Sequence, residues 1–123
     1  MVVDDEVSIR QLVSIVLERQ GYSVIQAEDG AEALDILKAE PDDAIQLIVT
    51  DVMMPRMNGV ELVKRSRNLR PRVKTIFMSG YTDVTSLTED GDSPPFMHKP
   101  MRPDTILSIV RQTLGTDAGR SSA

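Results

Sequence analysis

Short apolar runs alternate with longer amphipathic stretches along the chain, and this pattern predicts alternating strands and helices. The clearest strand is Leu47-Ile48-Val49, an unbroken apolar run of the kind found in strands that are buried on both faces. This strand leads directly to Asp51, after which Pro55 and Asn58-Gly59 turn the chain. The other predicted strands cover residues 2–3, 22–27, 73–79 and 96–99.

Between these strands, apolar residues recur at intervals of three and four, which is the spacing of one buried helix face. Gly21 ends the first such stretch, Asp29 can cap the second and Pro71 follows the third. Pro103 is suited to the first turn of the last helix. The predicted helices cover residues 9–17, 31–39, 60–70 and 103–114, with a weaker candidate at 83–90.

The limits of this pattern define one domain, residues 1–115. The chain has 123 residues, which is enough for one domain with a sizeable core but not for two. The segment from Thr116 to Ala123 is small and polar, and we expect a disordered tail there. The first apolar run, Met1-Val2-Val3, is short for a central strand, so we expect the domain to continue upstream in a parent protein.

Strands that alternate with helices predict a single doubly wound α/β domain of the (βα)5 type, with a parallel sheet covered on both faces. Right-handed crossovers then bring the carboxyl ends of all the strands to one edge of the sheet. Ligands bind at this edge in open α/β sheets. The residues that we therefore expect to meet there are Asp4, Asp5, Asp51, Ser79 and Lys99.

Composition limits the chemistry of such a site. The net charge is -5 and lysine and arginine occur all along the chain, so we expect no nucleic-acid binding. There is no cysteine, which excludes disulfides, cysteine-based metal sites and cysteine nucleophiles. No apolar run reaches membrane-spanning length, and we expect a cytoplasmic domain that makes no membrane contact of its own.

Carboxylates that converge in a small space repel one another unless a cation lies among them. Oxygen ligands without histidine or cysteine favour Mg²⁺, which commonly shares its coordination shell with phosphoryl oxygens. Asp51, at the end of the central strand, is the best placed of the acids to attack phosphorus and form an acyl phosphate. Lys99 would neutralise charge on the transferred group, and the Ser79 hydroxyl would donate a hydrogen bond to it.

Four short motifs carry a family resemblance. They are Val3-Asp4-Asp5-Glu6, Asp51-Val52-Met53-Met54-Pro55 with Asn58-Gly59, Met78-Ser79-Gly80 and Lys99-Pro100. Together and in this order, they make residues 1–115 resemble the receiver domain of two-component response regulators. The resemblance implies a flavodoxin-like fold with strand order 2-1-3-4-5. Residues 77–83 are most similar to receivers at the carboxyl end of hybrid histidine kinases, which would make this domain the cytosolic part of a membrane-bound protein.

The resemblance also implies residue roles. Asp51 would be phosphorylated by the phosphohistidine of a histidine kinase or a histidine phosphotransfer protein. Mg²⁺ would be held by Asp5, Asp51 and the backbone carbonyl of Met53, with Asp4 acting through water. A cis peptide would join Lys99 to Pro100. The domain would not be an enzyme acting on other substrates, since it would catalyse only its own phosphorylation and dephosphorylation.

A conformational switch is implied as well. Ser79 would move toward the phosphate while Phe96 swings inward, which would remodel the face formed by the fourth helix, fifth strand and fifth helix. A homodimer could form through that face. Phe96 takes the place of the tyrosine found in many members, and its role as core filler remains an open alternative. His98 alternates with Lys99 along its strand, and we expect it to face away from the acids.

Three other functions can be compared with this one. A hydrolase that uses an aspartyl phosphate needs a second acid two residues after its nucleophile, where this chain has Met53. A degenerate receiver, which binds partners without phosphorylation, would not be expected to keep Asp5, Asp51, Ser79 and Lys99. Flavin binding would need a serine- and threonine-rich phosphate loop after the first strand, and none is present there.

Overall fold

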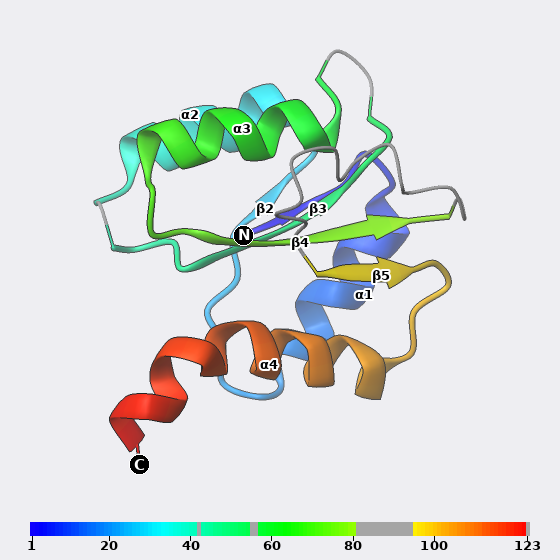
Figure 1. Cartoon of the computed structure of the whole chain (residues 1–123). Helices are drawn as coiled ribbons and strands as arrows, with labels where there is room; N and C mark the ends of the chain where they lie inside the picture. The colour runs from blue at the N-terminus through cyan, green and yellow to red at the C-terminus, as the bar shows by residue number, and fades with distance from the viewer. Residues whose placement is uncertain (42, 55–56, 81–94, 123) are drawn as a thin grey trace.

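The computed structural model describes residues 1–41, 43–54, 57–80 and 95–122, and within residues 116–122 it describes the backbone alone. Five parallel strands form one sheet in the order β2-β1-β3-β4-β5 (Figure 1). The strands are β1 (Val2–Val3), β2 (Gln26–Ala27), β3 (Leu47–Asp51), β4 (Lys74–Ser79) and β5 (Phe96–His98). The helices are α1 (Val7–Glu18), α2 (Gly30–Ala39), α3 (Gly59–Leu69) and α4 (Pro103–Ser122). The predicted fold class and strand order are both confirmed.

Helices cover both faces of the sheet. Helices α1 and α4 pack on one face, and α2 and α3 pack on the other (Figure 1). Val49 of β3 contributes to the first of these layers and the adjacent Ile48 to the second, because successive strand side chains point to opposite faces. Both side chains are at most 1% exposed, which confirms that β3 is buried on its two sides.

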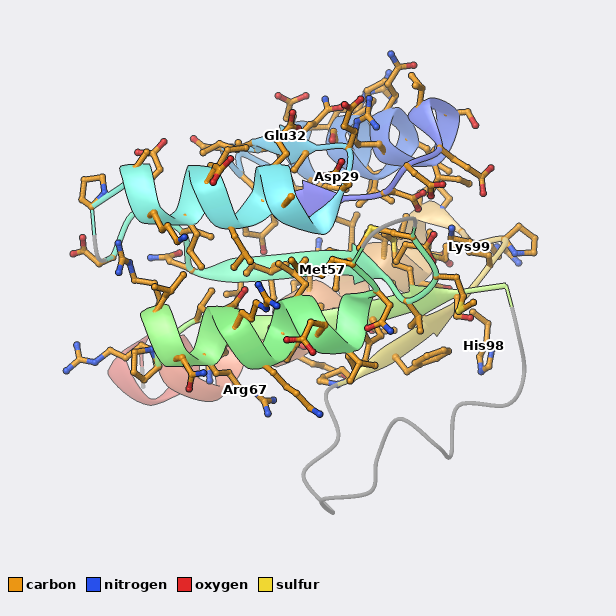
Figure 2. All side chains as sticks on the ribbon, turned by 90° about the horizontal axis from the view of Figure 1, so that it is seen from above. Asp29, Glu32, Met57, Arg67, His98 and Lys99 are labelled. Atoms are coloured by element: carbon orange, nitrogen blue, oxygen red, sulfur yellow. The ribbon has the colours of Figure 1, made fainter. Side chains whose placement is uncertain are left out.

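Local hydrogen bonds explain where α2 and α3 begin. The side chain of Asp29 accepts a hydrogen bond from the backbone N–H of Glu32 at 2.8 Å, and Asn58 accepts one from Glu61 at 2.9 Å. Such caps satisfy N–H groups that have no partner within the helix. Both caps lie at the sheet edge where the strands end, so they also fix the start of each helix beside the candidate site (Asp29 and Glu32 are labelled in Figure 2).

Two element boundaries differ from the prediction by more than two residues. The second strand was expected over residues 22–27 but covers only Gln26 and Ala27, because β1 offers only Val2 and Val3 as pairing partners. The last helix was expected to end near residue 114, but its bounds extend to Ser122. The disordered tail expected over residues 116–123 stays a prediction. The domain boundary at residue 115 stays a prediction.

Two further expectations concern the helices. The helix predicted over residues 83–90 lies outside the described residues, so α4 corresponds to the last helix predicted from the sequence. Of the helices in the described part of the chain, none is both long enough and apolar enough to cross a lipid bilayer.

Candidate functional site

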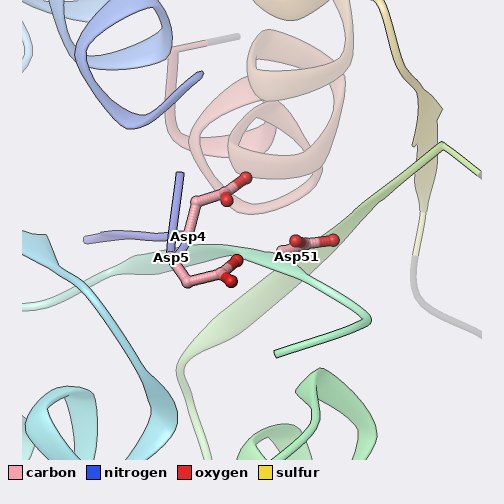
Figure 3. Close-up of side chains that lie close together, drawn as sticks. All are labelled: Asp4, Asp5 and Asp51. Carbon is pink, nitrogen blue, oxygen red and sulfur yellow. The ribbon is translucent and has the colours of Figure 1, made fainter. Parts of the chain in front are cut away.

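Three acidic side chains meet where β1 and β3 end. The two strands are parallel neighbours in which Val3 pairs with Thr50, so the residues that follow, Asp4 and Asp51, lie side by side. Asp4 is fully buried and Asp51 is 5% exposed, whereas Asp5 is exposed to solvent. One carboxylate oxygen from each of the three lies within 4.8 Å of those of the others (Figure 3). The predicted convergence of these acids is therefore found.

Lys99 reaches the acids from the other side of the site. It follows β5, and its Nζ lies 2.9 Å from Oδ2 of Asp4 and 3.2 Å from Oδ2 of Asp51. The Glu6 carboxylate is further away, at 3.9 Å. The Lys99 backbone N–H donates to the carbonyl of Ser79 at 2.7 Å, which fixes the end of β5 against β4. The ammonium thus bridges residues that are far apart in the sequence.

Burial and charge act together on this group of side chains. Burial raises the pKa of Asp51, and the neighbouring Asp4 raises it further, while Lys99 and the N–H of Met53 act in the opposite direction. Burial by itself would lower the pKa of Lys99, but the adjacent carboxylates of Asp4 and Asp51 outweigh this effect and raise it. Lys99 is therefore a stable cation among several acids, and negative charge remains in excess.

This donor set fits a hard divalent cation. Asp4, Asp5 and Asp51 offer oxygen ligands alone, which suits Mg²⁺. The exposed Asp5 leaves the site open to solvent, as Mg²⁺ requires if it is to retain part of its water shell. Met53 lies at the rim with its side chain 59% exposed, and its N–H is 3.4 Å from Oδ1 of Asp51. Coordination by the Met53 carbonyl and a water-mediated role for Asp4 stay predictions.

The predicted switch residues occupy neighbouring strands. Ser79 ends β4 and is 3% exposed. Phe96, in β5, is half-buried and packs against an apolar cluster that includes Val52 and Phe77. The predicted cis peptide between Lys99 and Pro100 is present. Phe96 is thus partly buried against this cluster in the observed conformation, and the switch roles of Ser79 and Phe96 stay predictions.

His98 does not join the acids. It is exposed and lies on the other side of the β5 end from Lys99 (Figure 2). Its ring packs edge-on against Phe96 with 5.0 Å between ring centroids. The expectation that His98 points away from the acids is confirmed.

The connection between β3 and α3 is held by two close contacts that the sequence analysis did not identify. A Cβ atom on Gly59 would overlap the carbonyl oxygen of Asp51, and the Gly59 N–H donates to the carbonyl of Val52 at 2.8 Å. Met57 packs on Gly30 at the start of α2, where a Cβ would lie 2.9 Å from the methionine sulfur (Figure 2). Gly30 and Gly59 each follow the end of a predicted strand, and this position in the sequence could have indicated that the chain packs closely there.

Arg10 is another residue that the sequence analysis missed. From the first turns of α1, its Nη1 donates to the backbone carbonyl of Asp4 at 2.7 Å. An arginine placed one turn after an acid-rich strand end is the sequence feature that could have drawn attention to it. The Arg10 side chain therefore helps to fix the acids in place, because it hydrogen-bonds to the backbone of Asp4.

The family model for the response regulator receiver domain matches residues 1–111. The chain belongs to this receiver domain family. The receiver is similar to sporulation initiation phosphotransferase F of Bacillus subtilis, with 32% identity over 116 residues that cover 93% of this chain and 91% of that protein. It is also similar to the CAI-1 autoinducer sensor kinase/phosphatase CqsS of Vibrio cholerae, with 37% identity over 115 residues. That match covers 89% of this receiver and only 16% of the kinase.

A solved structure agrees with this assignment. The receiver domain protein (CheY-like) from Methanospirillum hungatei superimposes on this receiver with a TM-score of 0.85 and 26% sequence identity, over 97% of this chain and 94% of that one. Receiver domains act in two-component signalling and interact with histidine kinases or phosphotransfer proteins, and their acidic residues bind Mg²⁺. The acids and the lysine of this chain occupy one edge of a receiver fold.

Proposed function

We propose that this receiver accepts a phosphoryl group on Asp51 from the phosphohistidine of a histidine kinase or a histidine phosphotransfer protein. The observation that carries the proposal is the position of Asp51. It ends the central strand, shares a 4.8 Å cluster with Asp4 and Asp5, and has the Lys99 ammonium 3.2 Å away. A carboxylate that is rigidly held, next to a cation and open to solvent through Asp5, is suited to attack phosphorus.

In the reaction, a carboxylate oxygen of Asp51 forms a bond to phosphorus as the phosphorus–nitrogen bond to the donor histidine breaks. The electron pair stays on the departing imidazole nitrogen, and the product on Asp51 is an acyl phosphate. Bound Mg²⁺ would supply positive charge for the phosphoryl oxygens. Lys99 supplies a second positive charge, and the Ser79 hydroxyl donates a hydrogen bond to a phosphoryl oxygen. The chain catalyses its own phosphorylation and dephosphorylation and does not turn over other substrates.

Phosphorylation acts on partners through Ser79 and Phe96. Ser79 moves toward the phosphoryl group, and Phe96, which packs against the apolar cluster of Val52, Val63 and Phe77 in the observed conformation, swings inward. The output face is formed by β5, α4 and residues 83–90, which lie outside the described part of the chain. A homodimer would use the same face.

Exposed apolar side chains support docking of a donor protein near the rim. Val7, Leu12 and Ile15 on α1 are 52%, 39% and 48% exposed, and Met53 at the rim is 59% exposed. Apolar surface of this kind is typical of protein–protein contacts. We place the receiver in the cytoplasm, in a hybrid kinase or as a separate regulator, and expect it to contact neither nucleic acid nor membrane directly.

Acetyl phosphate with Mg²⁺ provides the direct test, with intact-protein mass spectrometry as the readout. The wild-type chain should gain the mass of one phosphoryl group, and chelation of Mg²⁺ should prevent the gain. Asp51→Asn should not gain it, whereas Asp35→Asn, on the exposed side of α2, should. A folded wild-type chain that gains no mass would favour a degenerate receiver. A gain that persists in Asp51→Asn would place the modification on another residue.

A further inference from the structure

The backbone between Asp4 and Glu6 carries two of the three acids, and its position decides where Asp5 points. Asp4 is fixed at both its backbone and its side chain. Its N–H donates to the carbonyl of Ala27 at 3.2 Å, and its carboxylate accepts a hydrogen bond from the Glu6 N–H and pairs with Lys99. Asp5 differs, because its carboxylate is exposed and no hydrogen bond or ion pair fixes it among the interactions of the described residues. The direction of the Asp5 side chain therefore depends on its backbone.

One side chain holds this backbone from α1. Arg10 Nη1 donates to the Asp4 carbonyl at 2.7 Å, and Arg10 Nε donates to the side-chain oxygen of Gln26 on β2 at 3.2 Å. The backbone of Arg10 is itself fixed, since its N–H donates to Glu6 at 3.1 Å and its carbonyl accepts from the Ser14 hydroxyl at 2.7 Å. The guanidinium thus joins α1, β2 and the acid-bearing segment.

We propose that Arg10 is a positioning residue for Mg²⁺ binding, which acts by fixing the peptide plane between Asp4 and Asp5. The Asp4 carbonyl belongs to that peptide, so a hydrogen bond to its oxygen sets the orientation from which the Asp5 side chain departs. The inference rests on the proposed function, because it assumes that these acids hold the metal. Arg10 itself touches neither the metal nor the phosphoryl group.

The chemistry of arginine suits this task better than that of other cations. A hydrogen bond from a charged donor is about twice as strong as one between neutral groups. The planar guanidinium also presents several N–H groups in a fixed arrangement, so that one side chain can meet the Asp4 carbonyl and Gln26 at once. A lysine would keep the charge but would not hold both acceptors in this geometry. We therefore expect Arg10→Lys to keep only part of the effect of Arg10 on Mg²⁺ binding.

The test compares Arg10→Ala, Arg10→Lys and Gln26→Ala with a matched control, Arg111→Ala. Arg111 also donates to a glutamine side chain, Gln20, at 3.4 Å, but it lies on α4 and contacts none of the acids. Mg²⁺ affinity is measured from the backbone amide signals of Asp5 and Glu6 during titration. The phosphorylation rate with acetyl phosphate is measured at limiting and at saturating Mg²⁺, and urea unfolding reports stability.

Loss of an outer-shell partner typically weakens metal binding by about 10- to 100-fold. We expect Arg10→Ala to lower Mg²⁺ affinity about 10-fold, with smaller losses for Arg10→Lys and Gln26→Ala. Saturating Mg²⁺ should restore most of the phosphorylation rate in each variant, because Arg10 acts through the metal. In the metal-free protein, the amide proton of Asp5 should exchange faster in Arg10→Ala than in the wild type. Arg111→Ala should match the wild type throughout.

Two results would overturn the inference alone: Arg10→Ala binding Mg²⁺ as tightly as the wild type, or Arg111→Ala weakening it equally. Should Arg10→Ala fail to fold, unchanged Mg²⁺ affinity in both Arg10→Lys and Gln26→Ala would overturn it. A folded wild-type chain that binds no Mg²⁺ would instead overturn the proposed function together with this inference. The two failures are therefore distinguishable.

Discussion

Gly59 lies so close to Asp51 that a Cβ atom at position 59 would overlap the Asp51 carbonyl oxygen. Asp51 ends β3 and Gly59 begins α3, so the contact closes the connection between them. The Gly59 N–H strengthens it by donating to the carbonyl of Val52 at 2.8 Å. The first turn of α3 is thus fixed directly against the backbone of the proposed phospho-acceptor.

Gly59→Ala should therefore destabilise the fold and displace the Asp51 backbone. Forcing one extra carbon into a tightly packed place typically costs about 1–3 kcal/mol. Urea unfolding measures this loss. Gly115→Ala is the matched control, because a Cβ there would meet nothing within 4 Å and the residue lies within α4. Alanine is the better helix former by about 1 kcal/mol, so the control should be unchanged or more stable. Equal effects in both variants would contradict this account.

Lys99→Ala should lower stability, because it leaves the fully buried Asp4 carboxylate without its cation. Removing one partner of a buried ion pair typically costs about 3–5 kcal/mol, and the Lys99 side chain is only 13% exposed. We expect a loss near the lower end of that range in the absence of Mg²⁺, measured by urea unfolding at neutral pH. Lys64→Ala, on the exposed side of α3, controls for the removal of a lysine and should change little.

The same Lys99→Ala variant separates phosphorylation from its consequence. Phosphorylation of Asp51 should remain partly possible, because the acids that would hold Mg²⁺ are intact. Phosphate-dependent partner binding should be lost, because no ammonium couples the phosphoryl group to the end of β5. Mass spectrometry and a partner-binding assay measure the two steps separately. Normal phosphate-dependent binding in this variant would contradict the role assigned to Lys99.

Asp51 should give the stability a specific pH dependence. Burial, followed by Asp4, raises the pKa of Asp51, so the folded chain retains a proton that the unfolded chain has lost. Stability therefore falls as pH rises from the ordinary value of 3.8 through the raised pKa. Asp51→Asn removes this pH-dependent contribution to the free energy of unfolding. Without Mg²⁺, the stability of the variant relative to the wild type should therefore increase between about pH 4 and pH 7. Urea unfolding across that range checks the sign.

A control and a contrary outcome complete this test. Asp35→Asn, on the exposed side of α2, removes a carboxylate at a distance from the acids. Its stability difference from the wild type should not follow the trend expected for Asp51→Asn. A difference between Asp51→Asn and the wild type that stays constant with pH, or that shrinks as pH rises, would contradict the proposed effect of burial.

Met53 should lengthen the lifetime of the acyl phosphate. Its side chain is 59% exposed at the rim, two residues after Asp51, and it cannot activate a water molecule. Bulk at this place excludes attacking water. Met53→Asn should therefore lose phosphate faster, whereas Met53→Leu, which keeps the bulk, should decay like the wild type. The decay of the phosphorylated mass after the donor is removed gives both rates. Unchanged or slower decay in Met53→Asn would contradict the prediction.

Most of the sheet and its acids could be predicted because their signals are local and their convergence follows from topology. An unbroken apolar run marks β3, and parallel strands with right-handed crossovers place Asp4, Asp51 and Lys99 at one edge without any knowledge of their contacts. The length of β2 could not be predicted in this way. It depends on how many residues β1 offers for pairing, which the sequence of β2 does not contain.

The supports of the site were harder to predict, because they are contacts between segments whose distance is set by the whole fold. Gly59 fits against Asp51 only because α3 starts where it does. Arg10 reaches the Asp4 carbonyl only because α1 packs on the sheet in a position that brings its first turns next to the end of β1. Neither residue differs in local sequence from an ordinary turn glycine or an ordinary helical arginine.

The expectation of evenly spread positive charge was wrong in one segment. Of the 14 lysines and arginines, six fall between Lys64 and Lys74, along α3 and into β4 (Arg67 is labelled in Figure 2). Part of this charge is used internally. Arg65 pairs with Glu61 at 2.8 Å, and Arg70 donates to backbone carbonyls at the end of α2. The absence of nucleic-acid binding stays a prediction.

The edge-on contact between His98 and Phe96 gives β5 a spectroscopic reporter. His98 is the single histidine of the chain, so in D₂O, once the amide protons have exchanged, its ring C–H signals cannot be confused with those of another histidine. With 5.0 Å between the ring centroids, the magnetic shielding of the phenyl ring displaces those signals. Rotation of Phe96 would change the displacement. Rearrangement of the strand can thus be followed in real time, in unlabelled protein, while the donor is added.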